Sequence, residues 1–128
     1  MQTKTLEKLL TEANDLVKRL SFEESINLIN NSKAIIIDVR EESEVFNLGL
    51  VKNAIHIPRG LLEFKLSPNS PNNPAPIDDE TNILVYCAGG YRSALAAKTL
   101  LDLGFKNVYN LGGFQEWVDS GGEIQPNV

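Results

Sequence analysis

The stretch Ile83-Leu84-Val85-Tyr86-Cys87-Ala88-Gly89-Gly90-Tyr91-Arg92-Ser93-Ala94-Leu95-Ala96-Ala97 decides the fold of this chain. It begins as an apolar run typical of a buried strand, continues as a short loop with two glycines, and ends as an alanine-rich segment typical of a helix. The only cysteine, Cys87, stands where the strand ends. A thiol at this junction faces the N-terminus of the helix, whose amides and dipole favour negative charge. The stretch therefore predicts a cysteine with a lowered pKa and a nucleophilic thiolate.

A lone cysteine is also among the most buried residue types and can act as a small hydrophobe. We favour the reactive interpretation, because the two glycines after Cys87 carry no side chains that could bury the sulfur. The loop amides can instead point inward as a nest for an anion, and they belong to Ala88, Gly89, Gly90, Tyr91 and Arg92. Glycine permits the close turn that such a nest needs, and Arg92 adds a permanent positive charge. The sequence thus predicts a site for a thiolate, a persulfide or an oxyanion.

Length and composition limit the remaining choices. A chain of 128 residues is one domain that is long enough to bury a core. The net charge of −5 argues against nucleic acid and anionic membranes as partners. A single cysteine forms no internal disulfide, and no stretch reads as a signal peptide or a transmembrane span. We therefore expect a cytoplasmic protein.

The first twenty residues form a segment with its own pattern. Apolar residues recur there at three- and four-residue steps, as expected for an amphipathic helix: Leu6, Leu9, Leu10, Ala13, Leu16, Val17 and Leu20. We therefore divide the chain into a helical extension, 1–20, and a domain, 21–128. The helix is expected to pack on the domain; the alternative is a partner helix that pairs two chains as a homodimer. A second helix begins at a capping box formed by Ser21 and Glu24.

Further along, apolar runs alternate with helical patterns. We expect strands at 34–38, 54–57, 83–86 and 107–111, and helices at 42–48, 61–64, 93–103 and 114–119. The proline-rich segment 67–76 is expected to be a surface loop. Such alternation predicts an α/β domain with a mainly parallel sheet, in which ligands bind beyond the carboxyl ends of the strands. Both Cys87 and Asp38 follow the end of a predicted strand.

The other polar candidates have plain structural interpretations. His56 lies between two isoleucines before Pro58, so we expect a structural histidine, with a distant Cys-His pair as the alternative. One histidine and one cysteine argue against a zinc site. Glu44 follows Arg40 by four residues, within reach if the segment is helical. That pair would either support the site or be an exposed pair worth less than about 1 kcal/mol.

Taken together, residues 20–124 resemble the rhodanese family of sulfurtransferases. The resemblance is carried by Ile37-Asp38-Val39-Arg40 with Glu44, Ala54-Ile55-His56-Ile57-Pro58, Cys87-Ala88-Gly89-Gly90-Tyr91-Arg92-Ser93 and Tyr109-Asn110-Leu111-Gly112-Gly113-Phe114-Gln115-Glu116-Trp117. It implies a single-domain rhodanese-like α/β fold with a mainly parallel sheet flanked by helices. It implies no cofactor.

The resemblance assigns roles to the site residues. Cys87 would be the catalytic residue that carries sulfane sulfur as a persulfide. Substrate would be bound by Ala88, Gly89, Gly90, Tyr91 and Arg92, and the site supported by Asp38, Arg40 and Ser93. The span of six residues from Cys87 to Arg92 matches sulfur-handling members of the family. Related cell-cycle phosphatases and arsenate reductases have a loop one residue longer, which disfavours their chemistry here.

The function implied is transfer of sulfane sulfur from thiosulfate, polysulfide or a persulfide to a thiol or cyanide. The alternative is a non-catalytic sulfur carrier or a protein-binding module. Two departures from the family pattern stand out. Leu50-Val51-Lys52-Asn53-Ala54 replaces the His-Ile-Pro-Gly-Ala of many members, and Arg92 is the only basic residue of the loop. We therefore expect thiosulfate, a dianion, to be a poorer donor than a persulfide or polysulfide.

Overall fold

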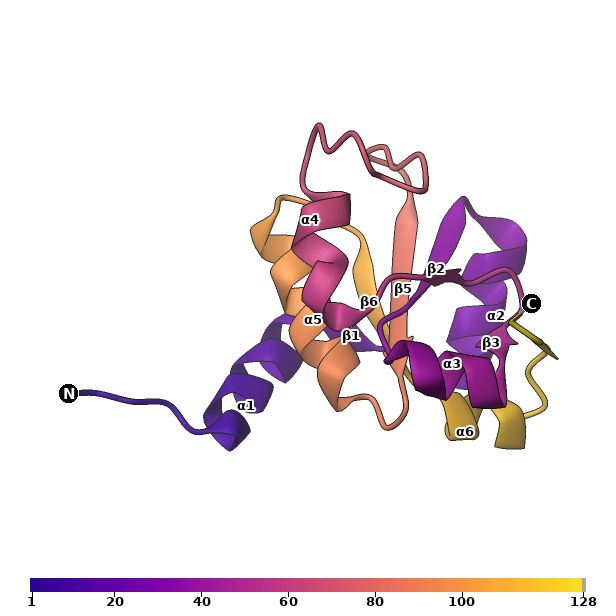
Figure 1. Ribbon diagram of the computed structural model, residues 1–128, viewed down its shortest axis with the longest axis horizontal. Coiled ribbons are helices and arrows are strands. Elements are labelled where there is room, and N and C mark those ends of the chain that lie inside the picture. The colour runs from indigo at the N-terminus through magenta and orange to yellow at the C-terminus, as the bar shows by residue number, and fades with distance from the viewer. Residues whose placement is uncertain (128) are drawn as a thin grey trace.

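A parallel sheet of five strands, with helices on both faces, forms the centre of the computed structural model, which describes residues 1–127 (Figure 1). The strand order is β1-β6-β5-β2-β4, and every neighbouring pair is parallel. The strands are β1 (Lys18–Arg19), β2 (Ala34–Asp38), β4 (Ile55–His56), β5 (Asn82–Cys87) and β6 (Val108–Gly113). A small antiparallel pair joins β3 (Leu50–Val51) to β7 (Ile124–Gln125). The expected α/β fold with a mainly parallel sheet is confirmed.

The apolar runs of β2 and β5 exist because both of their faces are buried. Successive residues of each strand point to opposite faces. Ile37 and Val85 therefore enter the core on one side of the sheet, while Ile36 and Leu84 enter the core on the other. All five residues of β2 pair in register with β5. The carboxyl ends of the two strands, which carry Asp38 and Cys87, consequently lie at the same edge of the sheet.

Three helices cover the first face: α1 (Leu6–Leu16), α4 (Leu62–Leu66) and α5 (Tyr91–Asp102), with the short 3-10 helix η1 (Arg59–Leu61) before α4. Helix α5 packs on β5 and β6, and α1 packs on α5, on the left in Figure 1. Small alanines let α5 approach the sheet closely, because Ala96 and Ala97 are fully buried in this core. The strand–loop–helix unit expected around Cys87 is thereby confirmed.

The opposite face is covered by α2 (Phe22–Asn31) and α6 (Phe114–Asp119), while α3 (Glu42–Leu48) begins just beyond the carboxyl end of β2. Leu84, Phe114 and Trp117 lie in this second core, where the ring of Trp117 contacts that of Phe22 at a centroid distance of 5.1 Å. The capping box at the start of α2 is confirmed by its two reciprocal hydrogen bonds. Within residues 1–127, no helix is long and apolar enough to cross a membrane.

The N-terminal segment differs from its predicted form. Helix α1 ends at Leu16, and the chain then extends into β1, which pairs with β6. Val17 and Leu20 are buried as expected, but they flank a strand rather than continue a helix. The helical spacing was ambiguous here, since two residues of strand leave no periodicity of their own. The two-residue strands β3 and β7 escaped prediction for the same reason.

The division at residue 20 remains a prediction that truncation can test. Removing residues 1–20 deletes α1, which packs on α5, together with β1, and it uncovers the core around Val17. We expect a loss of several kcal/mol in the free energy of unfolding, since burial of one Val or Leu contributes about 1.5–3 kcal/mol. Thermal melting measures this loss, with deletion of the exposed residues 1–4 as the control.

We further expect Cys87 to stay reactive in that shortened chain. A protein that melts cooperatively but no longer alkylates at Cys87 would contradict this expectation. If α1 is instead a partner helix, light scattering would show that the full chain self-associates and the shortened one does not, with little change in melting. The exposed apolar side chains of α1 that are available for such pairing are Leu6, Leu9 and Leu16.

Candidate active site

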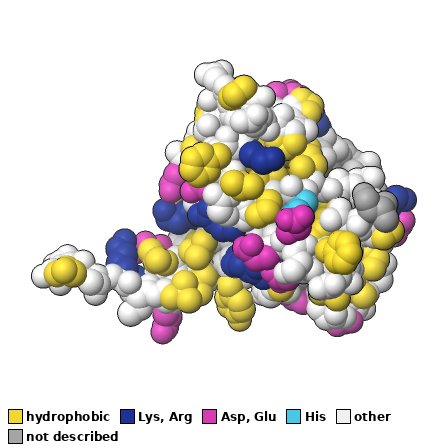
Figure 2. All heavy atoms as spheres, viewed as in Figure 1, with side chains coloured by type: hydrophobic (Ala, Val, Ile, Leu, Met, Phe, Trp, Pro, Cys, Tyr) yellow, Lys and Arg dark blue, Asp and Glu magenta, His cyan; other side chains and the backbone are white. Residues whose placement is uncertain are grey.

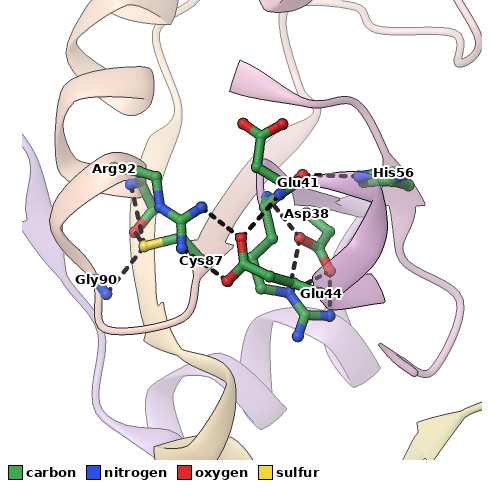
Figure 3. Close-up of polar contacts among 9 residues, drawn as sticks. Asp38, Glu41, Glu44, His56, Cys87, Gly90 and Arg92 are labelled. Atoms are coloured by element: carbon green, nitrogen blue, oxygen red, sulfur yellow. Dashed lines mark hydrogen bonds and ion pairs between the residues drawn. The ribbon is translucent and has the colours of Figure 1, made fainter. Parts of the chain in front are cut away.

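The loop after β5 turns back on itself so that its amides meet the sulfur of Cys87. The amide of Gly90 donates to Sγ at 3.0 Å and that of Ser93 at 3.4 Å (Figure 3). Gly90 precedes the first residue of α5 and has φ of 92°, a left-handed conformation that favours glycine. The turn thus places the N-terminus of α5 against the sulfur, as predicted.

Cys87 is buried, with 1% of its surface exposed, so the expectation that two glycines would leave it uncovered is wrong. Cys87 belongs to the first core cluster, together with Val85 and Ala97, so part of its burial comes from apolar side chains. The loop backbone also wraps around the sulfur, and the buried Ser93 places its hydroxyl oxygen 3.4 Å from Sγ. Ala88 and Gly89 form the exposed outer part of the loop.

Two opposing effects set the pKa of Cys87. Burial raises the pKa, but hydrogen bonds from the side chain and amide of Ser93 and from the amides of Gly90 and Gly89 outweigh it. The result is a pKa below the ordinary value of a thiol. Amides aimed at a sulfur stabilise its thiolate without any general base. Of the five loop amides expected to face an anion, those of Gly90 and Gly89 lower the pKa of the thiol. Ser93, for which only a supporting role was predicted, contributes hydrogen bonds to the sulfur from both its side chain and its amide.

Asn110 organises the back of this loop and was given no role from the sequence. Its Oδ1 accepts from the Gly112 amide at 3.0 Å, and its Nδ2 donates to the Gly90 carbonyl at 3.0 Å. Its Oδ1 also lies 2.8 Å from the hydroxyl oxygen of Ser93, whose single hydrogen can be donated either to Asn110 or to the sulfur of Cys87. These bonds fix which way the amide group points. Its one sequence signal was a polar residue within an otherwise apolar strand, and Asn110 is only 2% exposed.

The end of β6 and the edge strand β1 brace the loop from outside. A Cβ atom on Gly113 would lie 2.5 Å from the carbonyl oxygen of Ala88, so only glycine fits there. The guanidinium of Arg19 covers Gly90 and Gly112, because a Cβ on either would lie within 3.2 Å of it. Arg19 is therefore a second residue near the loop that the sequence did not reveal. Deletion of residues 1–20 removes it, so the expected reactivity of Cys87 in the shortened chain depends on the amides of the loop itself.

Arg92 and Glu44 form a two-bonded ion pair at the entrance of the site. Nη1 and Nη2 of Arg92 donate to the two carboxylate oxygens of Glu44 at 2.7 and 3.0 Å. The hydrogen bond to Arg92, set against a smaller opposing effect of burial, lowers the pKa of Glu44 to about 2. The predicted pairing of Glu44 with Arg40 is wrong, since α3 turns this carboxylate toward the Cys87 loop.

Arg40 pairs instead with Asp38, and both side chains are completely buried. The bonds from Nε and Nη2 of Arg40 to the Asp38 carboxylate measure 2.7–3.1 Å, and Nη2 also donates to the carbonyl of Gly49 at 2.6 Å. The guanidinium lies 4.2 Å from the ring centre of Phe114 and 5.5 Å from that of Tyr86. The alternative of an exposed Arg40 pair is therefore wrong.

His56 lies on the far side of this ion pair from Cys87 in Figure 3. Its Nε2 forms a hydrogen bond of 2.8 Å with the carbonyl oxygen of Arg40. This contact agrees with the structural interpretation of His56. In the described part of the chain, no three His, Cys, Asp or Glu side chains are grouped so that they could hold a metal ion.

The buried ion pair can be tested by substitution. Asp38→Asn leaves the Arg40 charge buried without a counter-charge, which typically costs about 3–5 kcal/mol. Urea unfolding should therefore show a loss of that size. Asp102→Asn is the matched control, because the Lys98–Asp102 pair is largely exposed and its loss should cost less than about 1 kcal/mol. Equal losses in the two variants would contradict a special role for the buried pair.

A second test concerns the ionisation of Cys87. The rate of alkylation by iodoacetamide against pH should have a midpoint below the value of about 8.5 for a free thiol. Ser93→Ala removes one donor to the sulfur and should shift that midpoint upward. A midpoint at or above the free-thiol value in the unsubstituted protein would show that burial outweighs the hydrogen bonds.

Comparison with known proteins places this site in a family. A family model of the Rhodanese-like domain matches residues 21–120. The thiosulfate sulfurtransferase GlpE of Coxiella burnetii is 32% identical over 103 residues, covering 80% of this chain and 88% of that protein. The tRNA uridine(34) hydroxylase of Prochlorococcus marinus is 36% identical over 95 residues, which are 72% of this chain but 30% of the hydroxylase.

Solved structures agree in fold over nearly the whole chain. A protein of unknown function from Rhodopseudomonas palustris, described as a possible tyrosine phosphatase, has a TM-score of 0.85 at 37% identity and covers 98% of this chain and 97% of its own. The polysulfide-sulfur transferase homodimer of Wolinella succinogenes has a TM-score of 0.72 at 33% identity, covering 92% and 85%. These relatives differ in described activity and share the domain. On this match, the chain belongs to the rhodanese family.

Proposed function

We propose that the protein is a sulfurtransferase that carries sulfane sulfur on Cys87. The observation that supports this most directly is the contact of Sγ with the amides of Gly90 and Ser93. Amide donors around a sulfur stabilise a thiolate before transfer and a persulfide anion after it. The similarity to a thiosulfate sulfurtransferase and a polysulfide-sulfur transferase points the same way.

The transfer would take two balanced steps. In the first, the Cys87 thiolate attacks the outer sulfur of the donor; a new S–S bond forms, and the old one breaks with its electron pair on the leaving group. The leaving group is sulfite when the donor is thiosulfate, and a thiolate when the donor is an organic persulfide. In the second, an acceptor attacks the outer sulfur of the Cys87 persulfide, which releases the Cys87 thiolate. The product is thiocyanate when the acceptor is cyanide, and a persulfide when the acceptor is a thiolate.

The remaining residues would serve these steps indirectly. Gly89 and Gly90 bring amides to the anion, and Ser93 adds its hydroxyl. Ala88 and Tyr91 form the exposed rim that a donor would meet first. The Asp38–Arg40 pair supports the site at the carboxyl end of β2. Arg92 would contribute charge, to the extent that Glu44 leaves it free.

A non-catalytic carrier or binding module is the second candidate, and turnover separates the two. A phosphatase is disfavoured by the span of six residues from Cys87 to Arg92, since the related phosphatases have a loop one residue longer. The related homodimer makes pairing of two copies a further proposal here, with the exposed Leu6, Leu9 and Leu16 of α1 as the candidate contact.

Sulfur loading on Cys87 is the decisive test. After exposure to polysulfide, the intact mass should rise by one sulfur atom and return on treatment with dithiothreitol or cyanide. Cys87→Ser should abolish both the mass change and sulfur transfer to cyanide, because Cys87 is the only thiol of the chain. Transfer that survives in Cys87→Ser would exclude the proposal, and loading without repeated turnover would favour the carrier.

A further inference from the structure

We propose that Glu44 determines donor specificity, by neutralising Arg92 and so disfavouring donors that carry two negative charges. The donor class that fits is a persulfide, organic or protein-bound, whose reacting end carries at most one negative charge. This inference rests on the proposed function and deepens it. It is carried by the ion pair at the entrance of the site.

The first step of the argument is the geometry of Arg92. Its two terminal nitrogens both face the carboxylate of Glu44, at 2.7 and 3.0 Å. In Figure 3 the guanidinium lies between that carboxylate and the sulfur of Cys87. The pKa of Arg92 is raised, chiefly by its hydrogen bonds to Glu44 and to a smaller extent by the charge on Cys87. The cation is thus close enough to affect the sulfur, while two of its five N–H donors are taken up by Glu44.

The second step is that Glu44 is held in place independently of Arg92. Glu44 Oε1 accepts a hydrogen bond of 3.0 Å from the amide of Glu41, which closes the capping box at the start of α3. With a pKa of about 2, the carboxylate stays negative at any physiological pH. The helix therefore presents a fixed negative charge to Arg92, and the pair has no net charge.

The third step is the charge that each donor brings. Attack on thiosulfate joins a thiolate to a dianion and releases sulfite, another dianion. An organic persulfide anion brings one negative charge fewer than thiosulfate to the thiolate, and a neutral hydropersulfide brings two fewer. A neutralised Arg92 offers little compensation for the dianion. Figure 2 shows acidic and basic side chains next to each other in the centre of the face that it displays, close to the histidine.

Glu44→Gln tests this with the fold preserved. The glutamine oxygen can still accept the amide hydrogen of Glu41, but the side chain no longer carries the charge that neutralises Arg92. Glu42→Gln is the matched control: it makes the same change on the same helix at an exposed residue outside the ion pair. Circular dichroism and thermal melting should show both variants folded.

The first readout needs no sulfur chemistry. Iodoacetate and iodoacetamide differ by one negative charge and little in size, so the ratio of their rates at Cys87 reports the potential at the sulfur. The rates are measured at low salt and at a pH above the midpoint of the Cys87 titration. The rate with iodoacetate divided by the rate with iodoacetamide should rise roughly three- to tenfold in Glu44→Gln and hardly change in Glu42→Gln. High salt should reduce this difference between the variants. An unchanged ratio in Glu44→Gln, or an equal rise in both variants, would overturn the inference.

The second readout is kcat/KM with thiosulfate and with a hydropersulfide donor. Glu44→Gln should raise the value for thiosulfate by a similar factor and leave that for the hydropersulfide nearly unchanged. A parallel fall for both donors would mean that Glu44 only positions the loop, and would contradict specificity control. Absence of sulfur transfer in every variant, with the alkylation ratio still shifted, would refute the proposed function and with it the donor class, while the electrostatic effect of Glu44 would stand.

Discussion

The buried ion pair of Asp38 and Arg40 is the constraint on which the arrangement around the site depends. A charge with no solvent contact needs partners in fixed positions, because leaving it unpaired costs several kcal/mol. Here the partners come from elements far apart in sequence: the end of β2, the carbonyl of Gly49 after α3, and the rings of Tyr86 and Phe114. Helix α3 is thereby anchored at its C-terminal end, and that orientation brings Glu44 to Arg92.

Backbone groups carry most of the chemistry of the Cys87 loop. The amides that contact Sγ are available only because the chain turns at Gly90 and begins α5 directly afterwards. Asn110 then ties the carbonyl of Gly90 to the hydroxyl of Ser93, so the curvature of the loop and the orientation of its side-chain donor are set together. Such a site can ionise its cysteine without a histidine. His56 is accordingly not needed as a base, and its ring forms a hydrogen bond with the carbonyl oxygen of Arg40 instead.

The sequence predicted what local pattern and composition determine. The apolar runs of β2 and β5 indicated strands buried on both faces, and the glycines with the alanine-rich segment indicated the loop and α5. It did not predict which charges pair, because Arg92 and Glu44 lie 48 positions apart and meet only through the fold. Nor did it predict the burial of Cys87, which results from the loop backbone together with the apolar core on the α5 face of the sheet. Asn110 lies in β6 and Arg19 in β1, and both act through contacts with the loop that follows β5. The sequence gives no sign of such contacts between separate strands.

The Glu44–Arg92 ion pair has two opposing consequences for the site. It links α3 to the first turn of α5, which helps to hold the loop in shape, and it removes the one positive charge that the loop could offer to an anion. A site that had to bind a dianion would need that charge free. The backbone amides alone provide partial charges suited to a single negative sulfur, which is the charge of a thiolate or of a persulfide anion. The link between α3 and α5 and the proposed preference for persulfide donors therefore rest on the same contact.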